Sequence, residues 1–218
     1  IAGHSLGHYL SACALMYRST GEKVFLEKVN YIVDELEICQ TAHGDGYLGA
    51  FPNGKKILKD EVSKGDIRSQ GFDLNGIWVP YYNLHKTMAG LRDAYRLCNN
   101  NKALLVEQKL ADWIERIVAP LNDGQIQKML DCEHGGINEV LVDLYYDTGR
   151  KKYLDLSWKF HHKVILDSLA NGKDILPGIH GNTQIPKLIG LARRYELIGN
   201  KQDYKAATFF WDRVVNHH

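Results

Sequence analysis

Apolar side chains recur every three or four positions along most of the chain, the spacing that places them on one face of an α-helix. Short stretches rich in Gly, Asn, Thr or Pro interrupt this pattern, and almost no segment alternates with a period of two. The pattern predicts helices over residues 4–19, 24–39, 82–97, 103–118, 138–146, 152–169, 185–197 and 204–216. Consecutive helices joined by short turns form antiparallel hairpins, so we predict an all-α fold of four helical hairpins.

The first helix of each predicted hairpin ends on the same motif, a tyrosine four residues before a turn residue that suits a left-handed C-cap. These tyrosines are Tyr17, Tyr95, Tyr145 and Tyr195, separated by 78, 50 and 50 residues. An equal 50-residue interval is typical of a helical-hairpin repeat. Six such hairpins close into an (α/α)6 barrel, or toroid, so four would form about two thirds of one. An incomplete ring leaves apolar helix faces uncovered, which predicts possible self-association.

The additional length of the first interval falls in a segment without helical periodicity, residues 40–79. A connection of about 40 residues far exceeds the usual 4 to 6, which is typical of functional or disordered segments. Phe51, Phe72 and Trp78 supply apolar anchors that a free linker lacks. We therefore expect residues 1–218 to form a single all-α domain in which residues 40–79 are an ordered rim or lid.

The charge balance excludes several classes of partner. The 218 residues contain 27 Lys and Arg against 26 Asp and Glu, a formal net charge of +1. Without a basic field, the chain is not expected to bind nucleic acid or an anionic membrane. No apolar run approaches the roughly 18 residues of a membrane helix. No targeting signal can be recognised in the sequence. Because the helical pattern starts at the first residues, we expect a fragment of a longer protein. A bacterial periplasmic or secreted location is compatible with this expectation.

The cysteines do not indicate a metal site. Cys13, Cys39 and Cys98 lie on helical patterns, where a buried thiol is expected, whereas Cys132 lies in a polar turn and is expected to be the exception. No Cys-x-x-Cys spacing occurs. His4 and His8 have the i, i+4 spacing of metal ligands but lack a third partner, so packing or helix capping explains them better.

Polar, histidine-bearing segments open the first helix of each hairpin. In a ring of hairpins these helix starts lie at one end, so their side chains are expected to converge although they are far apart in sequence. Their His, Asn, Gln and Glu groups provide donors and acceptors for hydroxyl-rich ligands, and Trp and Tyr provide flat apolar faces for a sugar ring. The candidate binding residues are Trp78, Tyr82, His85, His134, Asn138, Glu139, His180 and Gln184.

A structural explanation exists for each of these residues. A single histidine is often a satisfied packing residue, and Glu139 near a helix start is favoured by the helix dipole alone. The pairs His161-His162 and His217-His218 come late in second helices, and we interpret both as surface residues. Two other functions stay open: a non-catalytic helical-repeat module that binds carbohydrate or protein, and an isomerase or lyase on a similar barrel.

Six motifs, in order along the chain, resemble the β-L-arabinofuranosidase-like glycoside hydrolases of families 127 and 146. They are Gly7–Ala12, Asp45–Leu48, Trp78–Lys86, Glu133–Glu139, His180–Lys187 and Phe210–Asp212. The resemblance implies an (α/α)6 catalytic barrel, followed in full-length relatives by β-sandwich domains. It also implies a retaining glycosidase whose nucleophile is a zinc-bound cysteine thiolate and whose acid/base is a glutamate. Zinc suits this role because it keeps a thiolate deprotonated at neutral pH.

The resemblance places the acid/base glutamate, the zinc ligands and the catalytic cysteine beyond His218. The fragment is therefore expected to hold no cofactor itself, to be inactive alone, and to supply the part that binds an arabinose-containing glycoside or oligosaccharide. By this resemblance, His85, His134 and His180 contact arabinofuranose hydroxyls, with Gln184, Asn138 and Glu139 as weaker candidates. Gly181 departs from the family, in which Ala is usual at that position.

Overall fold

Four helical hairpins form the framework of the computed structural model, which describes residues 3–218. Their helices are α1 (His4–Thr20) with α2 (Lys23–His43), α4 (Pro80–Cys98) with α5 (Asn101–Val118), α7 (Ile137–Thr148) with α8 (Lys151–Lys159), and α10 (Gly181–Ile198) with α11 (Lys201–Asn216). The predicted all-α hairpin fold is confirmed.

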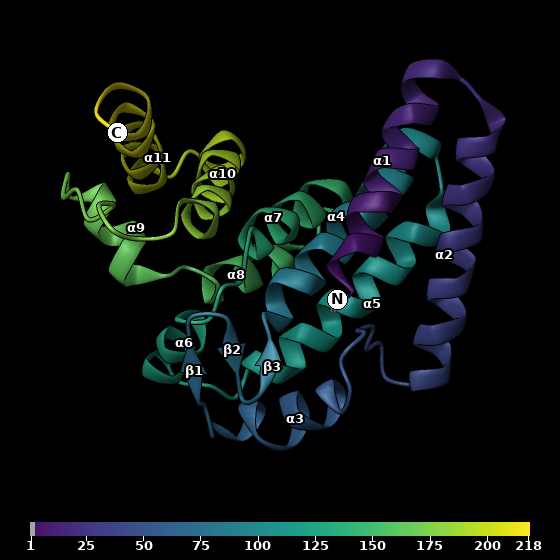
Figure 1. The fold of residues 1–218 in the computed structure, drawn as a ribbon, viewed down its shortest axis with the longest axis horizontal. Helices are drawn as coiled ribbons and strands as arrows, with labels where there is room; N and C mark the ends of the chain where they lie inside the picture. Colours follow the sequence, from purple (N-terminus) through teal and green to yellow (C-terminus); the bar gives the residue numbers. More distant parts are fainter. Residues whose placement is uncertain (1–2) are drawn as a thin grey trace.

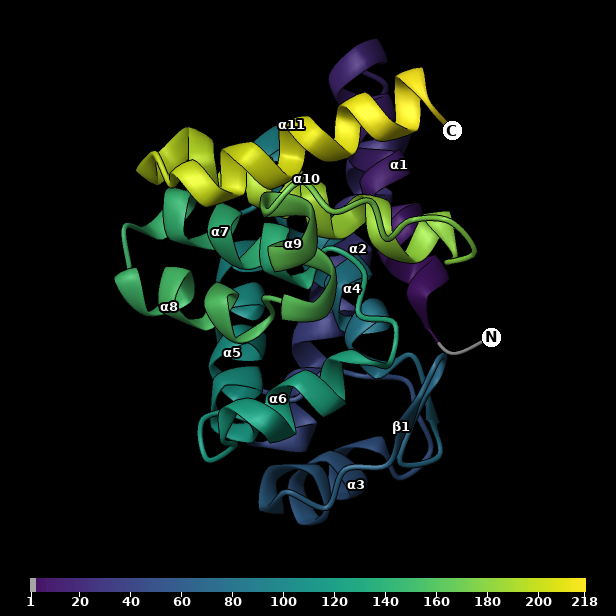
Figure 2. The ribbon, with the colours of Figure 1, turned by 90° about the vertical axis from the view of Figure 1, so that its left-hand side faces the viewer.

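The first helices of the hairpins lie side by side in the order α1, α4, α7, α10 (Figure 1). The second helices α2, α5 and α8 contact one another in the same order. Figure 2 shows that the N-terminal end of α1 and the start of α10 lie on the same side of the molecule. This row of inner helices is an open arc of a toroid, and it brings the starts of its helices to one end.

The repeated tyrosine motif ends helices as the sequence predicts. Gly21, Gly149 and Gly199 follow α1, α7 and α10 with left-handed φ angles of 73°, 69° and 69°. The N–H group of each donates a 2.8 Å hydrogen bond to the carbonyl oxygen of the tyrosine four residues earlier. Glycine adopts this conformation without the steric cost of a Cβ atom, which explains why it recurs at the repeat interval.

Two inner-helix contacts depend on the absence of a side chain. A Cβ atom on Gly7 of α1 would lie 2.0 Å from the carbonyl oxygen of Lys86 on α4. A Cβ atom on Gly190 of α10 would lie 2.3 Å from Asn138 Nδ2 on α7. Asn138 Nδ2 also donates a 2.9 Å hydrogen bond to the carbonyl oxygen of Lys187, so it ties α7 to α10. These glycines set how closely the helices of the arc approach.

The long connection between α2 and α4 is ordered. It contains α3 (Gly54–Asp60), a 3-10 turn (Val62–Lys64) and an antiparallel sheet of β1 (Ser69–Gln70), β2 (Asp73–Leu74) and β3 (Ile77–Trp78). Two-residue strands are too short to produce a period-two pattern, which is why they were not predicted. Tyr47, Leu58 and Leu74 anchor the segment in the core. Phe51 packs partly against the core, whereas Phe72 and Trp78 are 47% and 46% exposed, so their prediction as anchors was wrong.

The predicted helix over residues 152–169 is two helices, α8 and α9 (Lys163–Ala170). An additional helix, α6 (Asp123–Leu130), stabilises the break. The Gln127 amide of α6 donates to the carbonyl oxygen of His161 at 3.0 Å and accepts from the N–H group of Lys163 at 2.8 Å. The break turns His162 inward, where it is buried, so its interpretation as a surface residue was wrong.

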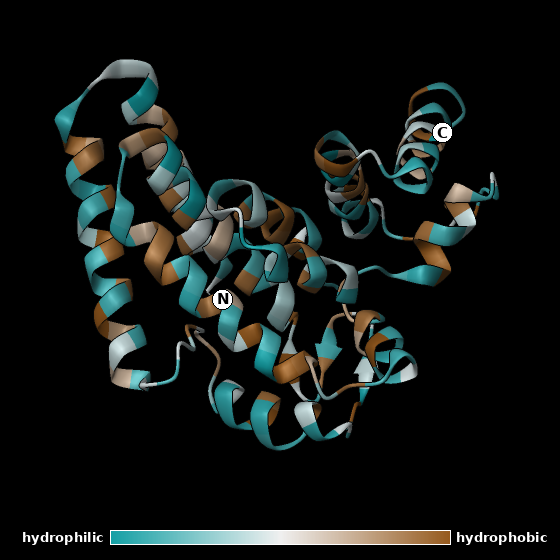
Figure 3. Ribbon diagram, turned by 180° about the vertical axis from the view of Figure 1, so that it is seen from behind, coloured by the Kyte–Doolittle hydropathy of each residue, from teal (hydrophilic) through white to brown (hydrophobic). Residues whose placement is uncertain are grey.

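The core is divided into two clusters. The larger one joins the first three hairpins with the α2–α4 connection and α6, and the smaller one packs α9 against α10 and α11 through side chains such as Leu166, Leu191 and Phe210. The last hairpin also leaves large apolar side chains in solvent, including Trp211 at 69% exposure. Figure 3 shows such hydrophobic positions among hydrophilic ones on these helices. In the described part of the chain, no helix is long and apolar enough to cross a membrane.

Two expectations for the cysteines were wrong. Cys132 is buried despite its polar neighbours in sequence, because the turn that carries it lies beneath the rim segment. Cys39 is exposed, because it borders an open hollow between α2 and the start of α1 that Leu6 and Leu36 also line.

Candidate functional site

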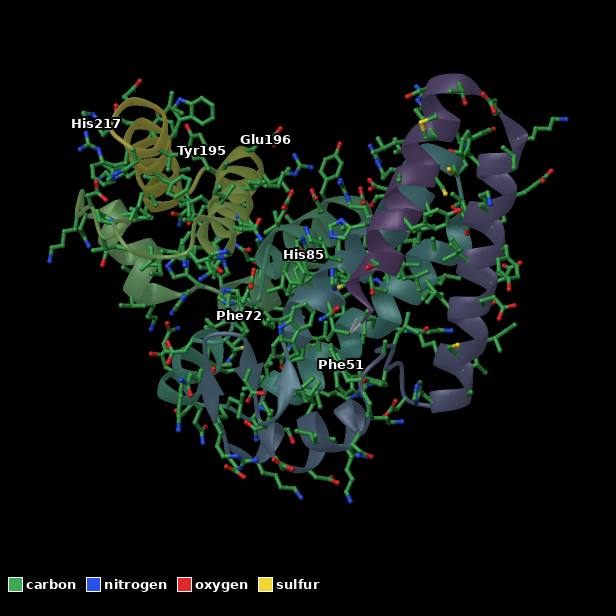
Figure 4. The ribbon with its side chains drawn as sticks, viewed as in Figure 1. Phe51, Phe72, His85, Tyr195, Glu196 and His217 are labelled. Atoms are coloured by element: carbon green, nitrogen blue, oxygen red, sulfur yellow. The ribbon has the colours of Figure 1, made fainter. Side chains whose placement is uncertain are left out.

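His85 lies near the start of α4, in the middle of the molecule (Figure 4). It is 4% exposed, and its Nδ1 atom accepts a 3.1 Å hydrogen bond from the N–H group of Gly136. An accepting Nδ1 atom places the proton of a neutral imidazole on Nε2. Burial, with the nearby charges of Lys86 and His8, lowers the pKa of His85 to about 3. His85 is therefore a neutral side chain with one N–H donor still available.

That donor and the Glu139 carboxyl group both lie against the Gly136 turn. A Cβ atom on Gly136 would lie 3.1 Å from His85 Nε2 and 3.0 Å from Glu139 Oε2. On Gly135, whose φ is 58°, it would lie 2.6 Å from His85 Nδ1 and 2.9 Å from Tyr82 Cδ2. Only glycine allows this turn to pass so close to both rings. The turn thus packs closely against a hydrogen-bond donor and a carboxyl group, which brings the two near each other.

The Glu139 carboxyl group has an altered proton affinity. Burial, together with the like charge of Asp143, raises its pKa to about 7, although Lys86, Arg92 and Arg193 act in the opposite direction. A carboxyl group with this pKa exists in both protonation states near neutral pH. Such groups concentrate at sites where protons are moved or where hydroxyl groups are bound.

Aromatic rings lie next to His85. The His4 ring on α1 lies 5.5 Å from the ring of Trp78 and 5.7 Å from that of Tyr82, and Tyr82 lies 6.2 Å from His85. Trp78 is half exposed and directly precedes Val79, a β-branched residue with a left-handed φ of 37°. A positive φ is unfavourable for such a residue and is most often found at functional sites. The arrangement offers a flat apolar surface beside polar groups.

A second polar cluster lies beneath the α7–α10 contact. Lys187 is 1% exposed, and its Nζ atom lies 3.0 Å from His162 Nδ1 and 3.0 Å from Gln184 Oε1. The His134 ring lies 5.6 Å from that of His162, and its Nδ1 atom bonds to the carbonyl oxygen of Cys132 at 3.1 Å. Burial lowers the pKa of Lys187 to about 8 and that of His162 to about 3.

Glu133 lies between the two clusters. It is 7% exposed, and burial raises the pKa of its carboxyl group. The side chains of His180, Lys187 and Lys86 and the Thr183 hydroxyl group act against this shift. Glu133 therefore links the start of α4 to the start of α10 electrostatically.

The structure separates the candidate residues predicted from the sequence into three groups. Tyr82, His85 and Glu139 lie against the turn at Gly135 and Gly136, and Trp78 adjoins them through the His4 ring; we call Trp78, Tyr82, His85 and Glu139 the α4–α7 site. His134 and Gln184 belong to the second, buried cluster, and Asn138 is 1% exposed in the α7–α10 interface. His180 is exposed before α10, bonds Thr183 Oγ1 at 2.9 Å and packs 5.9 Å from the Phe72 ring.

Within residues 3–218, no three His, Cys, Asp or Glu side chains lie together as potential metal ligands. Burial, with nearby carboxylates, raises the pKa of the Cys132 thiol to about 12, which keeps it protonated. The part of the chain that the structure describes thus does not fit the zinc–thiolate centre implied by the resemblance.

A family model described as β-L-arabinofuranosidase, GH127 catalytic domain, matches residues 1–218. The chain belongs to the GH127 family. The resemblance drawn from the motifs is therefore confirmed. A solved GH127 β-arabinofuranosidase has a similar fold, with a TM-score of 0.63 and 20% sequence identity over 96% of this chain. This GH127 chain spans only 33% of the length of that enzyme. The comparison with curated protein sequences found no match.

Sequence reasoning overlooked three residues of these clusters. Glu133 directly precedes His134, and Lys187 ends the polar segment that starts at His180, so both adjoined candidates that were singled out. His162 carried no such signal, because the helical pattern continues through it and only the contact with α6 interrupts the helix.

Proposed function

We propose that this GH127 chain is the sugar-binding part of a larger glycoside hydrolase that releases arabinose from β-L-arabinofuranosides. The observation that carries the proposal is the convergence of His85 Nε2 and Glu139 Oε2 on the Gly136 turn. A hydrogen-bond donor and a carboxyl group that lie side by side can together bind a hydroxyl group of a sugar. The Trp78 and Tyr82 rings beside them suit the apolar face of a furanose.

We place the bond-breaking groups outside these 218 residues. Zinc, when bound, would supply a deprotonated thiolate nucleophile, as the family resemblance implies. The residues described here would bind and orient the sugar: His85 donates a hydrogen bond from Nε2, Glu139 exchanges one with a hydroxyl group, and the buried Lys187 cluster fixes the position of α10. The natural substrate in this proposal is a glycoside or oligosaccharide that ends in arabinofuranose.

Hydrolysis of an aryl β-L-arabinofuranoside by the full-length protein, with zinc and a reductant present, tests this proposal. We expect release of arabinose from the β-L-arabinofuranoside and none from matched α-L-arabinofuranoside or β-D-xyloside controls. No release from any arabinofuranoside refutes the proposed activity. Sugar binding without hydrolysis by the full-length protein favours the alternative, a helical-repeat module that binds carbohydrate without cleaving it.

A further inference from the structure

A row of charged side chains crosses the inner helices one turn beyond the α4–α7 site. Asp143 on α7 accepts from Arg92 Nη1 on α4 at 3.0 Å and from Arg193 Nε on α10 at 2.7 Å. Arg92 Nε also bonds Asp147 at 2.9 Å. We call Arg92, Asp143 and Arg193 the charge ladder.

The ladder follows the 50-residue repeat. Asp143 and Arg193 occupy the same repeat position, two residues before Tyr145 and Tyr195. Asp143 is 5% exposed, and burying a carboxylate is costly unless it is paired. Two arginines from neighbouring helices pair with this carboxylate, so these contacts alone can explain the ladder as a structural feature.

Its position next to Glu139 suggests a second role. Glu139 and Asp143 are four residues apart on α7, so they lie on the same face with Cβ atoms about 5 to 6 Å apart. Asp143 is fixed by the two arginines and lies next to a carboxyl group that is largely removed from water. Two neighbouring carboxylates in such a place repel, and the one with fewer cationic partners binds a proton first.

Charged and titratable groups also face Glu139 from the helices packed against α7. They are His85, Lys86 and Arg92 from α4 and Arg193 from α10. The three cations oppose protonation, and none of them forms a recorded ion pair with Glu139 in the described part of the chain. The arginines are engaged by Asp143 and Asp147 instead.

We propose that Asp143, held by Arg92 and Arg193, is a positioning residue that raises the proton affinity of Glu139 and so favours this carboxyl group as a hydrogen-bond donor. This inference rests on the proposed function for the identity of the acceptor, a hydroxyl oxygen of the sugar. The proton itself belongs to the protein and does not depend on which glycoside is bound.

Infrared difference titration of the full-length protein tests the inference directly, with Glu139→Gln used to identify the carboxylic-acid band of Glu139. We expect the band to titrate with a midpoint near pH 7. Asp143→Asn should lower the midpoint by about one pH unit, because it removes the like charge. Arg193→Gln should raise it by about half a unit, because it removes a cation. A general loss of packing would not produce shifts of opposite sign.

Asp147→Asn is the matched control. Asp147 is also buried on α7 and paired with Arg92, but it lies eight residues, about 12 Å, from Glu139. We expect this variant to leave the midpoint within about 0.2 pH units of the wild-type value. A Glu139 that is fully ionised at pH 6, or equal shifts in Asp143→Asn and Asp147→Asn, overturns the inference. If Asp143→Asn does not fold, the direction of the Arg193→Gln shift still decides.

The infrared readout separates this inference from the proposed function. If Asp143→Asn and Arg193→Gln shift the midpoint in opposite directions but the protein hydrolyses no arabinofuranoside, the role of Asp143 is supported and the proposed activity is refuted. Hydrolysis by a protein whose Glu139 shows no acid band near neutral pH supports the activity and refutes the ladder.

Discussion

The two ring nitrogens of His85 have different partners, so two substitutions should separate stability from binding. Nδ1 accepts from the Gly136 N–H group at 3.1 Å, whereas Nε2 lies beside the Gly136 turn, on which Glu139 also packs. Asn places its side-chain oxygen close to the position of Nδ1 but has no group at Nε2. Gln places an amide near Nε2 but has no acceptor at Nδ1. The pair His85→Asn and His85→Gln therefore removes one function at a time.

The magnitudes follow from the burial of both atoms. His85→Gln leaves a buried backbone N–H group without an acceptor, which costs about 1 to 3 kcal/mol in the free energy of unfolding. His85→Asn keeps that hydrogen bond and should cost about 1 kcal/mol less than Gln. Loss of the Nε2 donor removes about 1.4 kcal/mol of sugar binding, or tenfold in affinity, in His85→Asn. We expect His85→Gln to retain most of the affinity.

Urea unfolding and calorimetric titration with L-arabinose, both on the full-length protein, measure the two quantities. The expected pattern is crossed: Asn is the more stable variant and Gln the tighter binder. If both variants lose stability and affinity to the same extent, the assignment of separate roles to Nδ1 and Nε2 is wrong.

Other predictions concern packing and pH. Gly190→Ala should lower the free energy of unfolding by about 2 kcal/mol, because its Cβ atom would lie 2.3 Å from Asn138 Nδ2. Gly181→Ala should raise the free energy of unfolding by about 0.5 kcal/mol, because no atom lies within 4 Å of its Cβ position. Urea unfolding of both variants measures the difference. The pKa values of His85 and His162 are lowered to about 3, so the unfolded chain binds more protons between pH 6.5 and 3. Each histidine therefore makes its full contribution to the free energy of unfolding above pH 6.5. As the pH falls, this contribution decreases, by about 2 kcal/mol for each histidine at pH 5. His162→Gln should remove one of these contributions, and an unchanged dependence of unfolding on pH would contradict the burial of His162.

The hairpins were predictable because each depends on local information. Helical periodicity and a glycine four residues after a tyrosine decide the elements, and both survive in the structure. The break at residues 160–162 was not predictable, because it depends on Gln127 from a separate helix. The three short strands were not predictable either, since two residues carry no pattern.

The candidate site was predictable only in part. Convergence of helix starts correctly placed His85 and Glu139 together, since it follows from the repeat. The orientation of each side chain depends on helix–helix packing: the close contact at Gly190 buries Asn138, and the inward turn of His162 encloses His134. Arg92 and Arg193 lie 47 and 54 residues from Glu139 along the chain, so their approach to α7 depends on helix–helix packing, which no local pattern shows.

The most direct test of the account is a crystal structure of the full-length protein with L-arabinose bound. We predict a sugar hydroxyl oxygen within hydrogen-bond distance of both His85 Nε2 and Glu139, with the ring next to Trp78 or Tyr82. Well-defined sugar at another position, with ordered water between His85 and Glu139, would contradict the assignment of the α4–α7 site.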